Sequence, residues 1–284
     1  MSIGAAVVVA SGWLGCLLPG CLGDPLTLEA TFLRPTAQMK ATPADYGYQY
    51  DEIYLRLDDS RQLCLWHVRS QNPKAIVVVI PGSDRNKSRY LIGLPVFVPH
   101  NYDVILMDYE GFGASSDAPL ELERLAEDGL AVTRFAQSLA SNVVAFGISA
   151  GGPVAVHAAA QLHLTAVILE APVVLENEVE LWLREHGLPL PLLWNIANLW
   201  VHPQIPESFD ILNNIRLLEE PKLILQSTED ETVPYFAGLS VYQAAPEPKA
   251  FFEMRGGHGR MIELEPELYT RTVISWLDEV LAAR

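Results

Sequence analysis

The sequence predicts an α/β fold in which a mostly parallel central sheet is flanked by helices. Short runs rich in β-branched residues alternate with longer segments whose apolar residues recur at helical spacing. The run at residues 75–80 is apolar at every position, as expected of a central parallel strand that is covered on both faces. Half of the 284 residues are hydrophobic and 19% are charged, so the chain can bury a large core and is not a disordered polypeptide.

The expected elements follow from these patterns in chain order. Two strands over residues 53–57 and 62–68 should form an antiparallel pair around a polar turn. The buried strands that follow are expected at residues 75–80, 103–107, 143–146, 166–169, 223–225 and 250–253. Helices are expected at residues 120–139, 153–162 and 266–283.

One segment interrupts the alternation of strands and helices. Residues 173–206 are rich in tryptophan, leucine and proline, carry no strand signal, and lie between two expected strands. We interpret them as a helical cap insertion above the sheet. The insertion either covers a substrate or is a pair of helices that closes the edge of the core.

The amino-terminal segment differs in composition from the rest of the chain. No residue before Asp24 carries a charged side chain, and residues 3–22 are almost continuously apolar. Four glycines and Pro19 lie within this run and Gly23 follows it, so the segment is a poor candidate for an uninterrupted helix. The sequence Leu-Pro-Gly-Cys at 18–21 resembles a bacterial lipobox, in which a peptidase cuts before the cysteine and the cysteine receives lipid. Cys21 is therefore the lipidation candidate, and Cys16 is a second one.

The lipobox interpretation predicts how the chain is divided into segments. Residues 1–20 form a signal or lipoprotein-type export segment, residues 21–45 an amino-terminal extension, and residues 46–284 the α/β domain. The expected location is the cell envelope, with the protein held at a membrane by its amino-terminal lipid or apolar segment. An ordinary cleaved signal, an uncleaved anchor and a soluble chain remain alternatives.

Charge and cysteine content limit the possible partners. Thirty-five acidic residues outnumber nineteen basic ones, and a net charge of −16 would repel a phosphate backbone, so no nucleic acid is expected. If Cys21 is lipidated, Cys64 has no partner and no disulfide framework exists. Cys64 lies in an apolar run and is expected to be a buried strand residue. No metal or organic cofactor is expected.

The strongest local motif reads Gly-Ile-Ser-Ala-Gly-Gly at residues 147–152. It follows an expected strand and opens an expected helix, which is the context of a G-x-S-x-G nucleophile elbow. The turn is sharp, so its flanking positions need glycine, and Ser149 is presented at a helix amino terminus that favours developing negative charge. Ser149 is therefore the predicted nucleophile.

A serine hydroxyl needs a base to accept its proton, and the chain has seven histidines. His258 lies in a glycine-rich loop after the last expected strand, which makes it the predicted base. The histidines of the cap segment, His186 and His202, are the main rivals.

The third catalytic member should hold the imidazole in place. Asp230 follows the strand at 223–225, so its carboxylate should reach the edge of the sheet where Ser149 and His258 lie. Glu170, after the preceding strand, is the main rival, and Glu229 is expected to be a solvated loop charge. The order serine, aspartate, histidine matches the α/β-hydrolase arrangement.

An acyl-transfer site also needs hydrogen-bond donors for the oxyanion of the tetrahedral intermediate. One predicted donor is the backbone N–H of Ala150, directly after the nucleophile. The other is the backbone N–H of Ser83, in the loop that follows the strand at 75–80.

Taken together, these residues resemble the α/β-hydrolase superfamily, and more narrowly the BEM46-like serine hydrolases related to the ABHD13 and ABHD17 groups. That family includes exported bacterial lipoproteins. Residues 102–115 are similar to its strand-and-turn segment, which usually reads Asp-Tyr-Arg-Gly-Tyr-Gly-x-Ser, and the resemblance extends from about residue 46 to the end. It implies the α/β-hydrolase fold, a structural role for Asp108, and a triad of Ser149, Asp230 and His258.

The chain departs from the family pattern at two places. The oxyanion loop commonly reads His-Gly-Asn-x-x-Asn, whereas Pro81 and Ser83 replace the histidine and the first asparagine here. Glu110 stands where the family has arginine.

The predicted function is hydrolysis of a small acyl ester or thioester by serine nucleophilic catalysis. A serine peptidase that uses the same triad is the nearest alternative. An envelope protein that binds without catalysis is a second alternative, motivated by the altered oxyanion loop.

Overall fold

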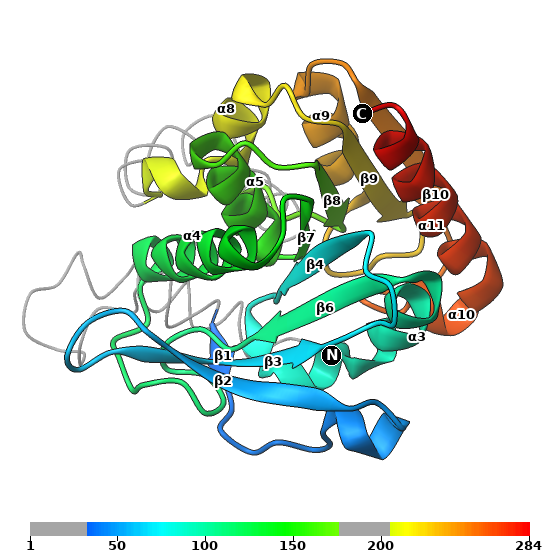
Figure 1. Ribbon diagram of the computed structural model, residues 1–284. Helices are drawn as coiled ribbons and strands as arrows, with labels where there is room; N and C mark the ends of the chain where they lie inside the picture. The colour runs from blue at the N-terminus through cyan, green and yellow to red at the C-terminus, as the bar shows by residue number, and fades with distance from the viewer. Residues whose placement is uncertain (1–32, 176–204) are drawn as a thin grey trace, which may run out of the picture.

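The apolar runs form the strands of one central sheet. The computed structural model describes residues 33–175 and 205–284, and its main sheet has eight strands in the order β10-β9-β8-β7-β4-β6-β3-β2 (Figure 1). Their bounds are β2 Tyr50–Arg56, β3 Gln62–Val68, β4 Ala75–Ile80, β6 Tyr102–Met107, β7 Val143–Ile148, β8 Ala166–Glu170, β9 Lys222–Ser227 and β10 Lys249–Met254. The pairs β2–β3 and β3–β6 are antiparallel and all other neighbours in this sheet are parallel. The predicted fold class is confirmed, including the amino-terminal hairpin.

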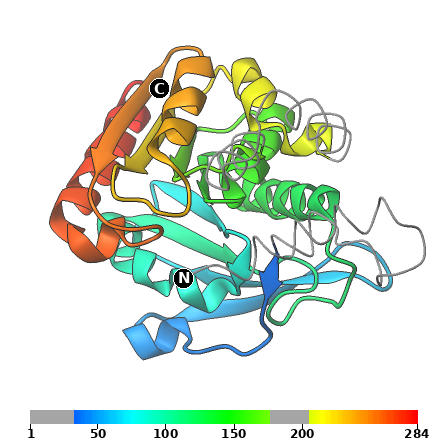
Figure 2. The ribbon, with the colours of Figure 1, turned by 180° about the vertical axis from the view of Figure 1, so that it is seen from behind.

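Helices cover both faces of the sheet, as Figures 1 and 2 show from opposite sides. One face packs against α4, α5, α8 and α9, and the other against α3, α10 and α11. The helix bounds are α3 Leu94–Phe97, α4 Leu122–Leu139, α5 Gly151–Gln161, α8 Ile211–Asn214, α9 Tyr235–Ala244, α10 Met261–Leu264 and α11 Pro266–Ala282. Short 3₁₀ helices connect several elements: η1 Pro43–Tyr46, η2 Lys87–Gly93, η3 Val98–His100, η5 Glu207–Phe209 and η6 Ile215–Leu217.

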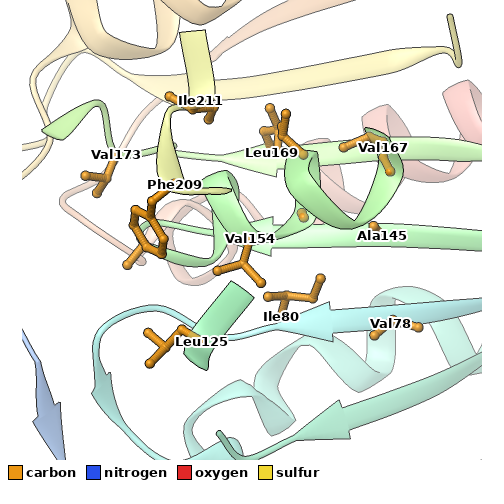
Figure 3. Packing of buried hydrophobic residues seen from close by; sticks show 14 of the residues in the cluster. Val78, Ile80, Leu125, Ala145, Val154, Val167, Leu169, Val173, Phe209 and Ile211 are labelled. Carbon is orange, nitrogen blue, oxygen red and sulfur yellow. The ribbon is translucent and has the colours of Figure 1, made fainter. Parts of the chain in front are cut away.

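The core is two-layered because successive residues of the central strands point to opposite faces. On β4, Val78 and Ile80 pack on the α4–α5 side, whereas Val77 and Val79 pack on the α11 side. Figure 3 shows the first layer, where Val154 of α5 and Leu125 of α4 lie close to Ile80. This alternation explains why β4 is apolar at every position.

A buried ion pair lies beneath the turn after β6. Lys87 is 1% exposed, and its ammonium group donates to the Asp108 carboxylate and to Cys64 Sγ. Asp108 also accepts the backbone N–H groups of Lys87 and Ala114. These contacts give Asp108 a structural role, and Cys64 is the buried strand residue that the sequence predicted.

A second, two-stranded sheet was not predicted. The strands β1 (Arg34–Pro35) and β5 (Asp84–Arg85) pair in parallel, which joins the amino-terminal extension to the loop after β4. Each strand is only two residues long, too short to leave a periodic pattern in the sequence.

Two predicted features lie outside the described residues and stay predictions. They are the export segment with Cys21, within residues 1–32, and most of the cap insertion, residues 176–204. In the part of the chain that the structure does describe, no helix combines the length and the hydropathy required to cross a bilayer.

Candidate active site

Ser149 occupies a strained turn between β7 and α5. Its φ angle is +56°, in the left-handed backbone region that residues other than glycine rarely adopt. Such a conformation costs on the order of 1–3 kcal/mol and persists only where surrounding contacts enforce it. Here the Ser149 N–H donates to the Glu170 carbonyl at 2.8 Å, and the Ser149 carbonyl accepts the Gly152 N–H at 2.9 Å. The elbow predicted from the motif is confirmed as a backbone feature.

The glycines on either side of Ser149 are required by close packing. A methyl group at Gly147 would lie 2.4 Å from the Gly151 carbonyl oxygen. A methyl group at Gly151 would lie 2.2 Å from the Ile80 carbonyl oxygen at the end of β4. The amino end of α5 can therefore pack against both β7 and β4 only when these two positions lack side chains.

Three predicted catalytic residues come together at the carboxyl ends of their strands. His258 Nε2 lies 3.0 Å from Ser149 Oγ, and His258 Nδ1 lies 2.8 Å from Asp230 Oδ2. The Asp230 side chain is fully buried and that of His258 is 23% exposed. The imidazole thus bridges the serine hydroxyl and a carboxylate, an arrangement suited to moving a proton between them.

Backbone bonds hold Asp230 in position. Its Oδ1 accepts the N–H groups of Thr232 and Val233, each at 2.8 Å, while Oδ2 faces the imidazole. Both carboxylate oxygens therefore have defined partners. This fixes the oxygen that meets His258.

The loops that carry Asp230 and His258 are tied to each other. The Glu229 carboxylate accepts the Gly256 N–H at 2.9 Å and the Arg255 Nε–H at 3.1 Å. The Gly256 bond, followed by the Arg255 bond, lowers the pKa of Glu229. Glu229 is exposed, but it is not the merely solvated charge that was expected.

Glu170, the rival acid, has a different partner. It is 4% exposed at the end of β8, and its carboxylate accepts the Tyr269 hydroxyl of α11. Burial raises the pKa of Glu170, an effect opposed by the Tyr269 bond and by nearby His258. The geometry therefore favours Asp230 as the carboxylate that orients the imidazole.

Among the other described histidines, His67, His100 and His163 have contacts of their own, that of His163 being with the Glu220 carboxylate at 3.5 Å. His67 is buried in β3 beside Asp103, at 3.1 Å, and His100 Nδ1 lies 2.8 Å from the Val96 carbonyl. His157 is in α5, where burial lowers its pKa. The cap histidines, His186 and His202, lie outside the described residues.

The loop after β4 touches the nucleophile elbow. A methyl group at Gly82 would lie 3.2 Å from Ser149 Cβ and 3.3 Å from the Tyr90 hydroxyl, so this approach leaves little room for a side chain. Ser83, the predicted oxyanion donor, follows directly. Ala150, the other predicted donor, is 1% exposed and stands at the start of α5. The structure thus brings both donor segments to Ser149.

The amino-terminal extension forms hydrogen bonds to the loop after β4. The Arg34 N–H donates to the Ser83 carbonyl at 2.7 Å. Asn86 donates from Nδ2 to the carbonyls of Thr36 and Gln38, each at 2.9 Å. These bonds, together with the β1–β5 pairing, make the extension part of the site's support, which the sequence did not indicate.

The chain is similar in sequence to one protein family and to several individual proteins. Residues 71–211 match the family described as Serine aminopeptidase, S33, a span that contains Ser149 but ends before Asp230 and His258. Protein ABHD12B of Homo sapiens is 29% identical over 208 residues, which cover 64% of this chain and 53% of that protein. Alpha/beta hydrolase domain-containing protein 17C of Mus musculus is 25% identical over 175 residues, 60% of this chain and 49% of that protein.

A third relative matches over more of its length. An uncharacterized membrane protein of Saccharomyces cerevisiae is 25% identical over 227 residues, 78% of each chain. The chain thus spans about half the length of ABHD12B and of protein 17C, and more than three quarters of the yeast protein.

Solved structures agree in fold. An esterase from Pyrococcus furiosus superposes with a TM-score of 0.71 at 15% identity, over 88% of this chain and 97% of that chain. An alpha/beta hydrolase from Penicillium gives a TM-score of 0.65 at 18% identity, over 82% and 99% of the two chains. Identities this low establish a likeness of fold alone.

Proposed function

We propose that this chain is a serine hydrolase of the α/β-hydrolase superfamily and that it cleaves an ester or thioester. The observation that carries the proposal is the pair of hydrogen bonds from Ser149 Oγ to His258 Nε2, at 3.0 Å, and from His258 Nδ1 to Asp230 Oδ2, at 2.8 Å. The strained Ser149 backbone supports it, because strain of this kind concentrates at functional sites.

In the proposed acylation step, Ser149 Oγ attacks the acyl carbonyl while His258 Nε2 accepts the serine proton. Asp230 keeps the other ring nitrogen protonated and stabilises the imidazolium that forms. The N–H groups of Ala150 and Ser83 donate to the developing oxyanion. The leaving alcohol or thiol departs with the proton that His258 returns.

Deacylation uses the same groups in reverse order. His258 takes a proton from water, and the resulting hydroxide attacks the carbonyl of the acyl-serine. The second tetrahedral intermediate collapses by breaking the bond to Ser149 Oγ, which regains its proton from His258. The products are the free acid and the regenerated serine.

The proposal is tested with p-nitrophenyl acetate and butyrate, which report turnover by colour. Wild type should hydrolyse them, and Ser149→Ala should reduce kcat by at least about 10³-fold because the covalent route is lost. Ser138→Ala, an exposed serine of α4, is the matched control and should retain wild-type kcat. Equal turnover by wild type and Ser149→Ala would refute the mechanism.

A serine aminopeptidase is the second candidate, favoured by the family match over residues 71–211. The same triad would then attack an amide, and His258 would protonate the leaving amine. Aminoacyl p-nitroanilides measured beside the esters separate the two activities. A higher kcat/KM for the anilides would replace the esterase proposal with the peptidase one.

We also propose that the protein acts at a membrane, held there by its amino-terminal segment. The absence of charge before Asp24 and the lipobox-like residues 18–21 support this proposal, as does the membrane assignment in the yeast relative's name. Intact mass should show a lipid adduct on wild type and none on Cys21→Ala. An unchanged mass and unchanged membrane retention in Cys21→Ala would reject Cys21 as the anchor.

A further inference from the structure

The loop after β4 offers few backbone donors to an oxyanion. Its residues in order are Pro81, Gly82 and Ser83, and proline has no N–H. The Gly82 N–H is already used, because it donates to the Tyr90 hydroxyl at 2.7 Å. Across residues 33–175 and 205–284, no acceptor is found for the Ser83 N–H. Ser83 is therefore the residue of this loop with a backbone donor free for a substrate.

The hydrogen bonds of one peptide group explain why the Gly82 N–H is used and the Ser83 N–H is not. The Pro81–Gly82 peptide is bonded at both ends: the Pro81 carbonyl accepts the Tyr109 hydroxyl at 2.9 Å, and the Gly82 N–H donates to Tyr90. A peptide group is planar, so two bonds at opposite ends fix its orientation. The next peptide group, which carries the Ser83 N–H, is joined to that plane through the φ and ψ angles of Gly82, so holding the plane leaves these two angles to set its direction.

Both tyrosines are suited to holding a backbone group. Tyr90 is 9% exposed in η2, and Tyr109 is fully buried two residues after the end of β6. Burial is the main cause that raises the pKa of each hydroxyl, with Asp84 adding to it at Tyr90 and Tyr90 itself adding to it at Tyr109. Each hydroxyl therefore stays protonated at neutral pH, and neither presents a negative charge to an oxyanion.

We propose that Tyr90 and Tyr109 form a clamp on the Pro81–Gly82 peptide, and that this clamp aims the Ser83 N–H at the oxyanion formed on Ser149. The two tyrosines are positioning residues, since they act through the peptide and not on the substrate. Pro81 has no N–H, and the clamp uses the Gly82 N–H, so the Ser83 N–H is the donor of this loop that is left for the oxyanion. This inference rests on the proposed serine hydrolase function.

The test combines hydroxyl deletions with removal of the donor. Tyr90→Phe and Tyr109→Phe keep the rings but release the peptide, and Ser83→Pro removes the N–H itself. Tyr102→Phe is the matched control, because it deletes another buried hydroxyl, one that donates to Asp278 at 2.6 Å from the opposite end of the sheet. Steady-state kinetics with p-nitrophenyl butyrate give kcat and KM, and a trifluoromethyl ketone reports affinity for an oxyanion.

Each single tyrosine variant should lower kcat by roughly 10- to 100-fold and leave KM within about threefold, because the donor stabilises the transition state more than bound substrate. Inhibition by the ketone should weaken in parallel with kcat. Ser83→Pro should lower kcat by about 10²- to 10³-fold. Tyr102→Phe should match wild type.

The combined variant Tyr90→Phe/Ser83→Pro separates positioning from a general structural effect. If Tyr90 acts through the Ser83 N–H, the combined variant should be within about threefold of Ser83→Pro alone. Losses that multiply, or a Tyr90→Phe kcat equal to that of Tyr102→Phe, would overturn the clamp.

The remaining outcomes are also decisive. If Tyr90→Phe fails to fold, Tyr109→Phe tests the same peptide group from its other end. Full activity of Ser83→Pro would overturn the donor assignment whatever the tyrosine variants do. A wild type without Ser149-dependent turnover would instead refute the proposed function, which keeps the two failures distinct.

Discussion

Asp128 carries a pH-dependent cost to stability that one substitution should remove. It is 1% exposed in α4, where Oδ2 accepts the Glu110 N–H at 2.8 Å. Among the described residues, Asp128 Oδ1 has no hydrogen-bond partner, and neither do the carboxylate oxygens of Glu110. Burial, with the nearby negative charges of Glu110 and Glu127, raises the pKa of Asp128 to about 7.

The sign and size of the effect follow from that shift. The folded-state pKa lies above the unfolded value of 3.8, so between these pH values the folded state binds more protons than the unfolded state. The free energy of unfolding therefore falls as pH rises through this window. One pKa unit corresponds to about 1.4 kcal/mol, so the penalty is about 0.6 kcal/mol at pH 4, about 3 at pH 6 and about 4 at pH 8.

Asp128→Asn should abolish this penalty. The asparagine Oδ1 can still accept the Glu110 N–H, and its amide can donate to the Glu110 carboxylate, which lies 3.3 Å from Arg61 Nη1. At pH 8 the variant should melt roughly 7 °C above wild type, and at pH 4 the difference should fall to about 1 °C. Thermal unfolding followed by circular dichroism at pH 4, 6 and 8 measures this directly.

Glu123→Gln is the matched control, because it removes an exposed carboxylate from the same helix. Its Tm difference from wild type should stay within about 1–2 °C at all three pH values, as expected of surface substitutions. A Tm difference between Asp128→Asn and wild type that does not grow from pH 4 to pH 8 would refute the assignment of the penalty to Asp128.

Three further substitutions have defined outcomes. Asp230→Asn should keep the fold but lower ester kcat by roughly 10³- to 10⁴-fold, because its amide favours the wrong tautomer of His258; a loss below tenfold would argue against this role. Gly151→Ala places a methyl group 2.2 Å from a backbone oxygen of β4, so its yield of soluble protein and its Tm should fall, and an unchanged Tm would contradict the packing described. Lys87→Met leaves the Asp108 carboxylate buried without its ammonium partner and should lower the free energy of urea unfolding by about 3–5 kcal/mol; a loss under 1 kcal/mol would contradict that pairing.

The sequence predicted those parts of the fold that have a local pattern. The strands β4 and β7 were found because every residue in them is apolar, and β6 because a run of apolar residues follows Asp103. The elbow at Ser149 was found because its glycines have a fixed spacing. Helix α9 was missed because its apolar residues are not confined to one face and no polar cap marks its start after Pro234. A helix of this kind is recognised only once its tertiary contacts are known.

The sequence predicted the three residues that the structure brings together at the candidate site, but not the residues that support them. Ser149, Asp230 and His258 each follow a strand, so the topology brings them to one edge of the sheet. Glu229 and Tyr90 act through bonds to residues 27 and 8 positions away in the chain, and neither belongs to a motif. Supports of this kind depend on where loops meet in space, which no local pattern encodes.

The central claim is that Ser149 is an activated nucleophile. A fluorophosphonate probe reacts with such a serine, and the intact mass of the protein with peptide mapping locates the adduct. One probe equivalent should label wild type on Ser149, and Ser149→Ala should remain unlabelled while keeping the wild-type circular dichroism spectrum. A folded wild type that takes up no probe, or a Ser149→Ala variant labelled to the same extent, would contradict the account.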